Sequence, residues 1–150
     1  MTKLSILQVP FDIRSYEGVG PVWFGMTPDQ VHAAIGEPIR QARNRRDEAD
    51  ESWGVVSVRY DGKERTVVEV GLVPPARVFL EETELFSAQD PMRLLMVNDP
   101  APMEYLGFIV FFHLGVTLSG FHDRDPSQEA LTAFAPGRWD HLRSAMRPYR

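Results

Sequence analysis

Two histidines and two aspartates in the second half of the sequence are the best candidates for a catalytic or metal-binding site: His113, His122, Asp123 and Asp125. The pattern His-Asp-x-Asp offers an imidazole nitrogen and carboxylate oxygens, which could ligate a metal ion or act as a base with an orienting carboxylate. The alternative interpretation is structural. In it, residues 122–127 form a turn whose carboxylates accept bonds from backbone amides, and His113 packs within a strand. The structural interpretation is favoured, so we expect no catalytic residue, no metal and no cofactor.

Acidic side chains near the middle of the chain are the best candidates for a binding site. They are Glu81, Glu82, Glu84 and Asp90. An acidic surface speeds association with a basic partner. The alternative is that these charges only keep a sheet edge soluble and prevent it from pairing with other chains. The sequence leaves both interpretations open.

Composition narrows the classes of function. The chain has 150 residues, 43% of them hydrophobic and 25% charged, which is ordinary for one globular domain. A formal net charge of -5 and a pI of about 5.3 disfavour binding to nucleic acid through its phosphates. The absence of cysteine excludes disulfides and Cys-ligated metals. No apolar run reaches the length of a membrane span, so a cytoplasmic protein with no membrane contact is expected.

Residues 18–38 carry the strongest local signals and predict a short strand, a turn and a helix. Thr27 and Gln30 have the spacing of a capping box, and Pro28 stands at the first helical position. Gly36 can adopt the left-handed conformation that ends a helix. We therefore expect a helix from residue 28 to residue 35.

Outside this stretch the patterns favour strands. Asp61-Gly62 between two β-branched runs predicts a hairpin, and the glycine at 115 predicts a bend between two apolar strands. A second helix is expected to begin after either Ser87 or Asp90. Residues 39–52 carry four positive and four negative charges and are predicted to be a solvated loop. The strands are expected over 4–9, 22–24, 53–60, 65–73, 77–80, 105–121 and 130–135.

These elements predict one α+β domain over residues 1–150, with antiparallel sheets, helices on one face and a C-terminal helix over 137–147. Each of the two earlier helices is followed by paired strands. The ranges 18–75 and 76–136 are therefore either two copies of one unit or two segments that share only a coarse order. If they are copies, their sheets could join edge to edge.

The segment Gly-x-Gly-Pro-x-x-Phe-Gly-Met-Thr, closed by Ile-Gly-Glu-Pro, resembles a pattern in small bacterial proteins of mostly unknown function. Its helix-then-sheet order is also similar to the lipoprotein of the outer-membrane assembly machine, and two tandem copies are similar to the β-lactamase inhibitor protein. This chain lacks the acylated cysteine of the lipoprotein. The resemblance implies a fold that presents a sheet to another protein, as in small antidotes to toxins.

We therefore expect a non-enzymatic protein-binding module, in the form of a toxin-neutralising immunity protein, that acts by steric and electrostatic capture. A first alternative is a small-molecule or metal-dependent enzyme that uses His113, His122, Asp123 and Asp125. A second alternative is a structural subunit whose apolar second half pairs in a homodimer. The sequence does not decide between a monomer and a homodimer.

Overall fold

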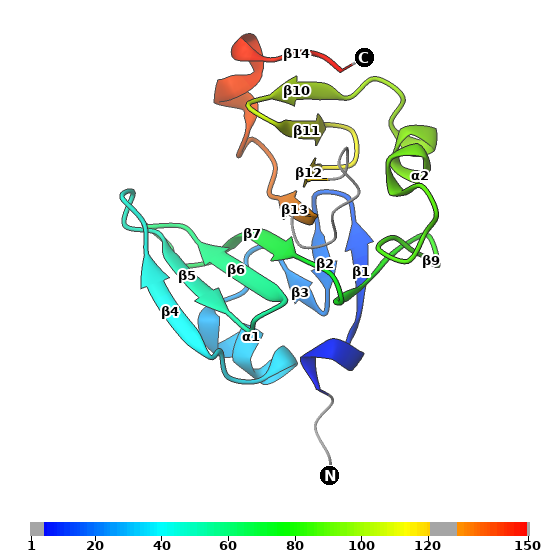
Figure 1. Cartoon of the computed structure of the whole chain (residues 1–150). Helices are drawn as coiled ribbons and strands as arrows, with labels where there is room; N and C mark the ends of the chain where they lie inside the picture. Colours follow the sequence, from blue (N-terminus) through cyan, green and yellow to red (C-terminus); the bar gives the residue numbers. More distant parts are fainter. Residues whose placement is uncertain (1–4, 121–128, 150) are drawn as a thin grey trace.

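The structure, a computed structural model, describes residues 5–120 and 129–149, and the strands within them form two sheets (Figure 1). The smaller sheet has the order β3-β2-β1-β8-β9, in which β1 and β8 are parallel neighbours. Its strands are β1 (Pro10–Arg14), β2 (Gly18–Gly20), β3 (Val22–Trp23), β8 (Arg77–Leu80) and β9 (Thr83–Glu84).

The larger sheet is antiparallel throughout and has the order β14-β10-β11-β12-β13-β7-β6-β5-β4. Its strands are β4 (Arg40–Arg43), β5 (Ala49–Ser52), β6 (Val56–Tyr60), β7 (Val67–Leu72), β10 (Met103–Tyr105), β11 (Phe108–Phe111), β12 (Val116–Ser119), β13 (Ala130–Phe134) and β14 (Arg147–Pro148). The expected α+β class is confirmed. Within the larger sheet, β7 of the first half of the chain pairs with β13 of the second half.

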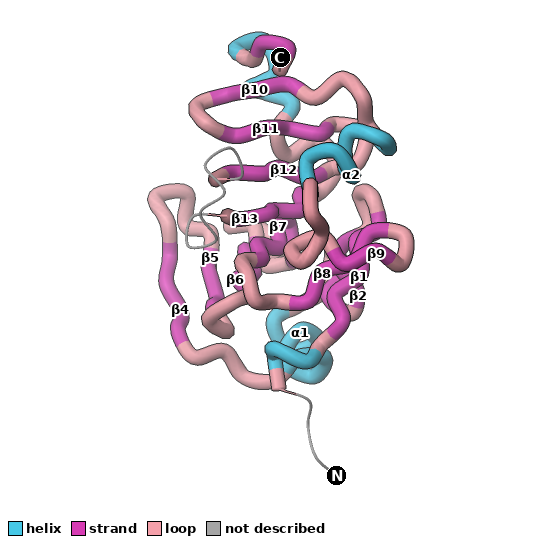
Figure 2. Tube along the Cα trace, turned by 45° about the vertical axis from the view of Figure 1, so that its right-hand side comes forward, coloured by secondary structure: helices cyan, strands magenta, loops and turns pink. Residues whose placement is uncertain are grey.

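The two halves of the chain run through their elements in the same order. In the first half β1–β3 are followed by α1 (Pro28–Ile35) and then by β4–β7. In the second half β8 and β9 are followed by α2 (Pro91–Asn98) and then by β10–β13. Figure 2 shows the two helices at separate places along the body of strands. An internal duplication stays a prediction, since a shared order of elements does not establish a common origin.

The local signals for the helices are confirmed. The Thr27 hydroxyl accepts a bond from the Gln30 amide at 3.3 Å, and the Gln30 side chain accepts one from the Thr27 amide at 2.9 Å. Pro28 is the first helical residue, and Gly36 ends α1 with φ 92°. Of the two starts considered for α2, the structure has the one at Asp90.

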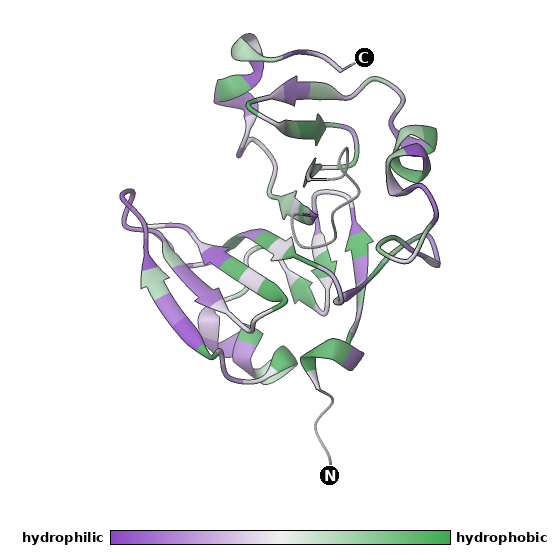
Figure 3. Cartoon of the chain, viewed as in Figure 1, coloured by the Kyte–Doolittle hydropathy of each residue, from purple (hydrophilic) through white to green (hydrophobic). Residues whose placement is uncertain are grey.

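The core lies between the two sheets. Alternate residues of β1, such as Phe11 and Ile13, point inward, while Asp12 and Arg14 lie on the outer face. Val58 and Leu118 point into the same core from the larger sheet. Each α-helix contributes one buried residue to it, Val31 from α1 and Leu95 from α2. Figure 3 shows that β11 is mainly hydrophobic, whereas β4 and β5 are mainly hydrophilic.

Three expectations are corrected. Residues 6–8 form a 3-10 helix, η1 (Ile6–Gln8), and the first strand begins at Pro10 rather than at residue 4. The charged range 39–52 is a hairpin of β4 and β5. Three of its acidic residues have partners elsewhere in the fold: Glu48, Asp50 and Glu51. The C-terminal helix is a 3-10 helix, η2 (Asp140–Ala145), and a short strand follows it.

Candidate functional site

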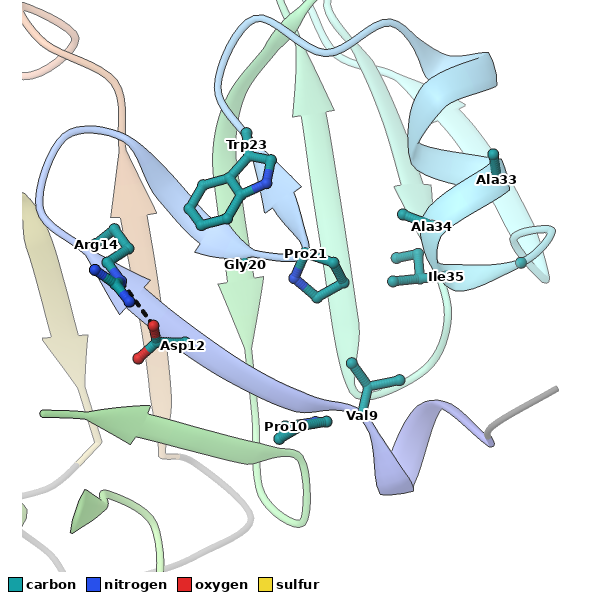
Figure 4. Close-up of a pocket in the computed structure, with 11 residues that line it drawn as sticks. Val9, Pro10, Asp12, Arg14, Gly20, Pro21, Trp23, Ala33, Ala34 and Ile35 are labelled. Atoms are coloured by element: carbon teal, nitrogen blue, oxygen red, sulfur yellow. Dashed lines mark hydrogen bonds and ion pairs between the residues drawn. The ribbon is translucent and has the colours of Figure 1, made fainter. Parts of the chain in front are cut away.

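The outer face of the smaller sheet carries a hollow of about 740 Å³ beside α1. Figure 4 shows Val9, Pro21 and Ile35 around this space, with the Trp23 indole at its side. The indole lies over Gly20, where a Cβ atom would come within 2.7 Å of the ring. A large aromatic surface is thus left at the hollow, with 36% of Trp23 exposed. We call this space the helix-side hollow.

A second hollow of about 780 Å³ adjoins the first, since both hollows are lined by Pro10, Asp12 and Arg14. We call it the turn-side hollow, because the turn between β8 and β9 forms one wall. Its charged residues are Asp12, Glu17, Glu81 and Glu82, with Arg14 as the only cation that lines it. Arg14 donates to Asp12 at 2.7 Å, so this cation is already paired.

The two hollows share Pro10, Asp12 and Arg14 in their linings, and we refer to the two together as the groove. The strand register places Gly20, Asp12 and Phe79 side by side across three neighbouring strands. Apart from the shared Asp12 and Arg14, the helix-side hollow is lined by uncharged, mainly apolar residues, whereas the turn-side hollow is lined by four carboxylates and one guanidinium group. Volumes in this range are typical of ligand sites. The groove therefore suits a ligand with an apolar part and a cationic part.

The turn at the acidic end is strained. Glu81 and Glu82 are the two residues between the paired ends of β8 and β9, and their φ angles are 47° and 73°. Both values lie in the left-handed region, where hairpin turns of this kind prefer Asn and Gly, and where another residue costs about 1 kcal/mol or more. Two glutamates at these positions are not explained by folding. Such outliers concentrate at functional sites.

A buried polar cluster fixes the helix that walls the groove. Glu51 is 5% exposed, and His32 Nε2 lies 2.9 and 3.0 Å from its two carboxylate oxygens. Tyr60 and Gln41 each donate to Glu51 at 2.7 Å. Burial, followed by the bond to Glu51, raises the pKa of the Tyr60 phenol. Because these donors share one carboxylate, the cluster holds α1 on β5 and β6 and pre-organises the groove.

A chain of five charges joins the C-terminal segment to the first half of the larger sheet. Arg138 donates to Glu48 Oε1 at 3.0 Å and to Glu69 at 3.0 Å. Arg59 in turn donates to Glu69 at 3.2 Å and to Asp50 at 2.7 Å. We call these residues the ion chain. The sequence interpretation of 39–52 as solvated is wrong at Glu48 and Glu51, which are both 5% exposed.

The ion chain predicts a loss of stability in acid. The bonds from Arg138 hold the pKa of Glu48 at about 2, well below its ordinary 4.5. Because the pKa of Glu48 is lower in the folded state, its ionised form stabilises the fold at pH values above its pKa in the unfolded chain. This stabilisation is lost as the pH falls from about 4.5 toward 2. We expect Glu48→Gln to flatten this part of a pH–stability curve measured by urea unfolding. A curve with the wild-type slope in Glu48→Gln would contradict this origin.

The four predicted binding residues have different environments in the structure. Glu81 and Glu82 line the turn-side hollow. Glu84 faces Arg77 at 3.7 Å and accepts a bond from Ser87 at 3.0 Å. Asp90 accepts a bond from the Arg93 amide at 3.1 Å and so caps α2. Of the four predicted residues, Glu81 and Glu82 are therefore the ones that line the groove.

Of the alternative polar cluster, His113 alone lies among the described residues. His113 is exposed, and its backbone amide donates to Asp99 at 2.8 Å. His122, Asp123 and Asp125 lie outside the described residues. Among residues 5–120 and 129–149, no three His, Asp or Glu side chains are grouped so that they could hold a metal ion.

Sequence reasoning missed Asp12 and Trp23 as residues of the groove. The alternation Phe-Asp-Ile-Arg at residues 11–14 could have revealed a strand with Asp12 on its outer face. Nothing local distinguishes Trp23, which lines the groove, from Trp53, which is 6% exposed and donates to Gly36 O at 3.0 Å.

Within the described part of the chain, neither α-helix has the length and apolar character needed to cross a membrane. A scan against protein-family models and searches of curated proteins and of solved structures found no match.

Proposed function

We propose that this chain is a non-enzymatic, cytoplasmic module that captures another protein by binding an extended basic segment in the groove. The observation that carries the proposal is the strained Glu81-Glu82 turn, which holds two exposed carboxylates beside a hollow that already contains Asp12 and Glu17. Neutralisation of a basic toxin is the form of this function that the resemblance to small bacterial antidotes suggests.

Two features of the groove support a protein segment as the ligand. The apolar end offers Trp23, Pro21 and Ile35, which suit an apolar side chain. The acidic end suits a lysine or arginine side chain a few residues away, with the carboxylates also attracting a basic partner from a distance. An exposed aromatic residue beside a pocket is typical of binding hot spots.

Affinity capture from lysate of the source cells, at low and high salt, tests this proposal. The tagged wild-type chain is expected to retain a basic protein in stoichiometric amount, and less of it at high salt. We expect Trp23→Ala and Glu81→Gln/Glu82→Gln to lose that protein. Glu64→Gln, which removes an exposed charge in the turn after β6, is the matched control and should retain it. Retention of the same partner by both groove variants would contradict the proposal.

A further inference from the structure

A separate hollow of about 240 Å³ lies on the face of the larger sheet that points away from the main core. Its floor is a row of four residues that pair directly across β6, β7, β13 and β12: Ser57, Gly71, Thr132 and Thr117. The row crosses the junction of the two halves, where β7 and β13 meet (Figure 1). We call it the junction hollow.

Gly71 keeps the junction hollow open. Its φ angle is not positive, so the backbone at this position does not require glycine. A Cβ atom there would stand 2.7 Å from Ser57 Oγ and 3.7 Å from Thr132 Oγ1. The missing side chain therefore leaves space above the sheet, between two hydroxyl groups.

The hydroxyl groups around this space have hydrogen-bonding capacity to spare. Within residues 5–120 and 129–149, the Ser57, Thr117 and Thr132 hydroxyls form no hydrogen bond with the protein. Thr117 is only 1% exposed. No side-chain polar atom in the described part of the chain is both hidden from solvent and unpaired. The Thr117 hydroxyl is therefore reached through the junction hollow.

The charges beside the junction hollow favour a cation. Arg59 uses Nε and Nη2 on Asp50 and Nη1 on Glu69, so its guanidinium is engaged with carboxylates. The whole ion chain contains three carboxylates and two guanidinium groups, so its formal charge is negative. Phe108 and Trp139 also line the hollow, with their ring centroids 5.7 Å apart. Aromatic faces attract cations.

We infer that the junction hollow binds a primary ammonium group on a short alkyl chain, as carried by a lysine side chain of a protein or by a small free amine. An ammonium group has three donors and no acceptor, which matches three hydroxyl oxygens that lack partners. The hollow is smaller than most pockets for drug-sized ligands, so it fits one side chain. The site is distinct from the groove on the smaller sheet.

The test follows the indole N–H signal of Trp139 by NMR, with the signal assigned by its loss in Trp139→Phe. The probes are butylammonium, Nα-acetyl-lysine methylamide and, as the uncharged isostere, Nα-acetyl-norleucine methylamide. We expect the cationic probes to shift the signal with Kd values of roughly 1–10 mM, and the norleucine probe to leave it unchanged.

Thr117→Val, which removes a hydroxyl from the floor, should weaken the cationic probes at least about tenfold. Thr83→Val, at an exposed position in β9, is the matched control. If Thr117→Val does not fold, Ser57→Ala/Thr132→Val provides the same test with the other two hydroxyls of the floor. Tighter binding of the lysine probe than of butylammonium supports a protein as the source, and the reverse supports a small amine. No shift with either cation, or an equal shift with norleucine, would overturn the inference.

Discussion

Replacing Arg138 with alanine is expected to lower the free energy of unfolding by about 3–5 kcal/mol, because the change leaves a buried carboxylate without its partner. Glu48 is 5% exposed and depends on Arg138 for two of its bonds. The same arginine ties the C-terminal segment to Glu69 on β7. Urea unfolding followed by circular dichroism measures the loss.

Arg147→Ala is the control for this prediction. Arg147 also pairs with a glutamate, Glu104, but its side chain is 82% exposed. An exposed pair contributes less than about 1 kcal/mol. The double variant Arg138→Ala/Glu48→Gln should recover part of the loss, since no charge is then left buried on Glu48. If Arg138→Ala costs no more than Arg147→Ala, the ion chain does not hold the two segments together.

The exchange Glu81→Asn/Glu82→Gly is expected to raise stability and weaken binding in one variant. Asn and Gly adopt positive φ with less strain, so the free energy of unfolding should rise by about 1–2 kcal/mol. Removal of two carboxylates from the turn-side hollow should weaken binding of the captured partner at least about tenfold. Thermal unfolding and titration calorimetry on the same preparation measure the two effects.

Glu81→Gln/Glu82→Gln separates charge from strain. This variant keeps side chains of similar size at the two positive φ positions, so stability should stay within about 0.5 kcal/mol of wild type. Binding should still fall, because the charges are gone. A gain in stability with unchanged affinity in the Asn-Gly variant would show that the partner does not use these carboxylates.

Those parts of the fold that depend on local chemistry could be predicted from the sequence. Thr27, Pro28 and Gln30 satisfy the amides of one helical turn among themselves, so their spacing alone places α1. Asp61 accepts bonds from the backbone amides of Glu64 and Thr66, which closes the predicted hairpin within a few residues. Both signals act over short distances along the chain.

Elements that depend on distant partners could not be predicted in this way. The acidic residues of β5 and the turn before it suggested a solvated loop, but Glu48 is paired with a residue 90 positions away. The junction hollow likewise combines residues from β6, β7, β12 and β13. Of the candidate site, the sequence indicated Glu81 and Glu82 through their charge, whereas their positive φ angles became visible only in the structure.

Amide hydrogen exchange, measured on the chain alone and in complex with its captured partner, shows directly whether the partner binds in the groove. We expect new protection at Asp12, Arg14, Gly20 and Trp23 and in residues 79–82, all of which line the groove. β4, an edge strand of the larger sheet with exposed residues, should exchange at the same rate in both states. Protection confined to the larger sheet, with the groove unchanged, would show that the partner binds elsewhere.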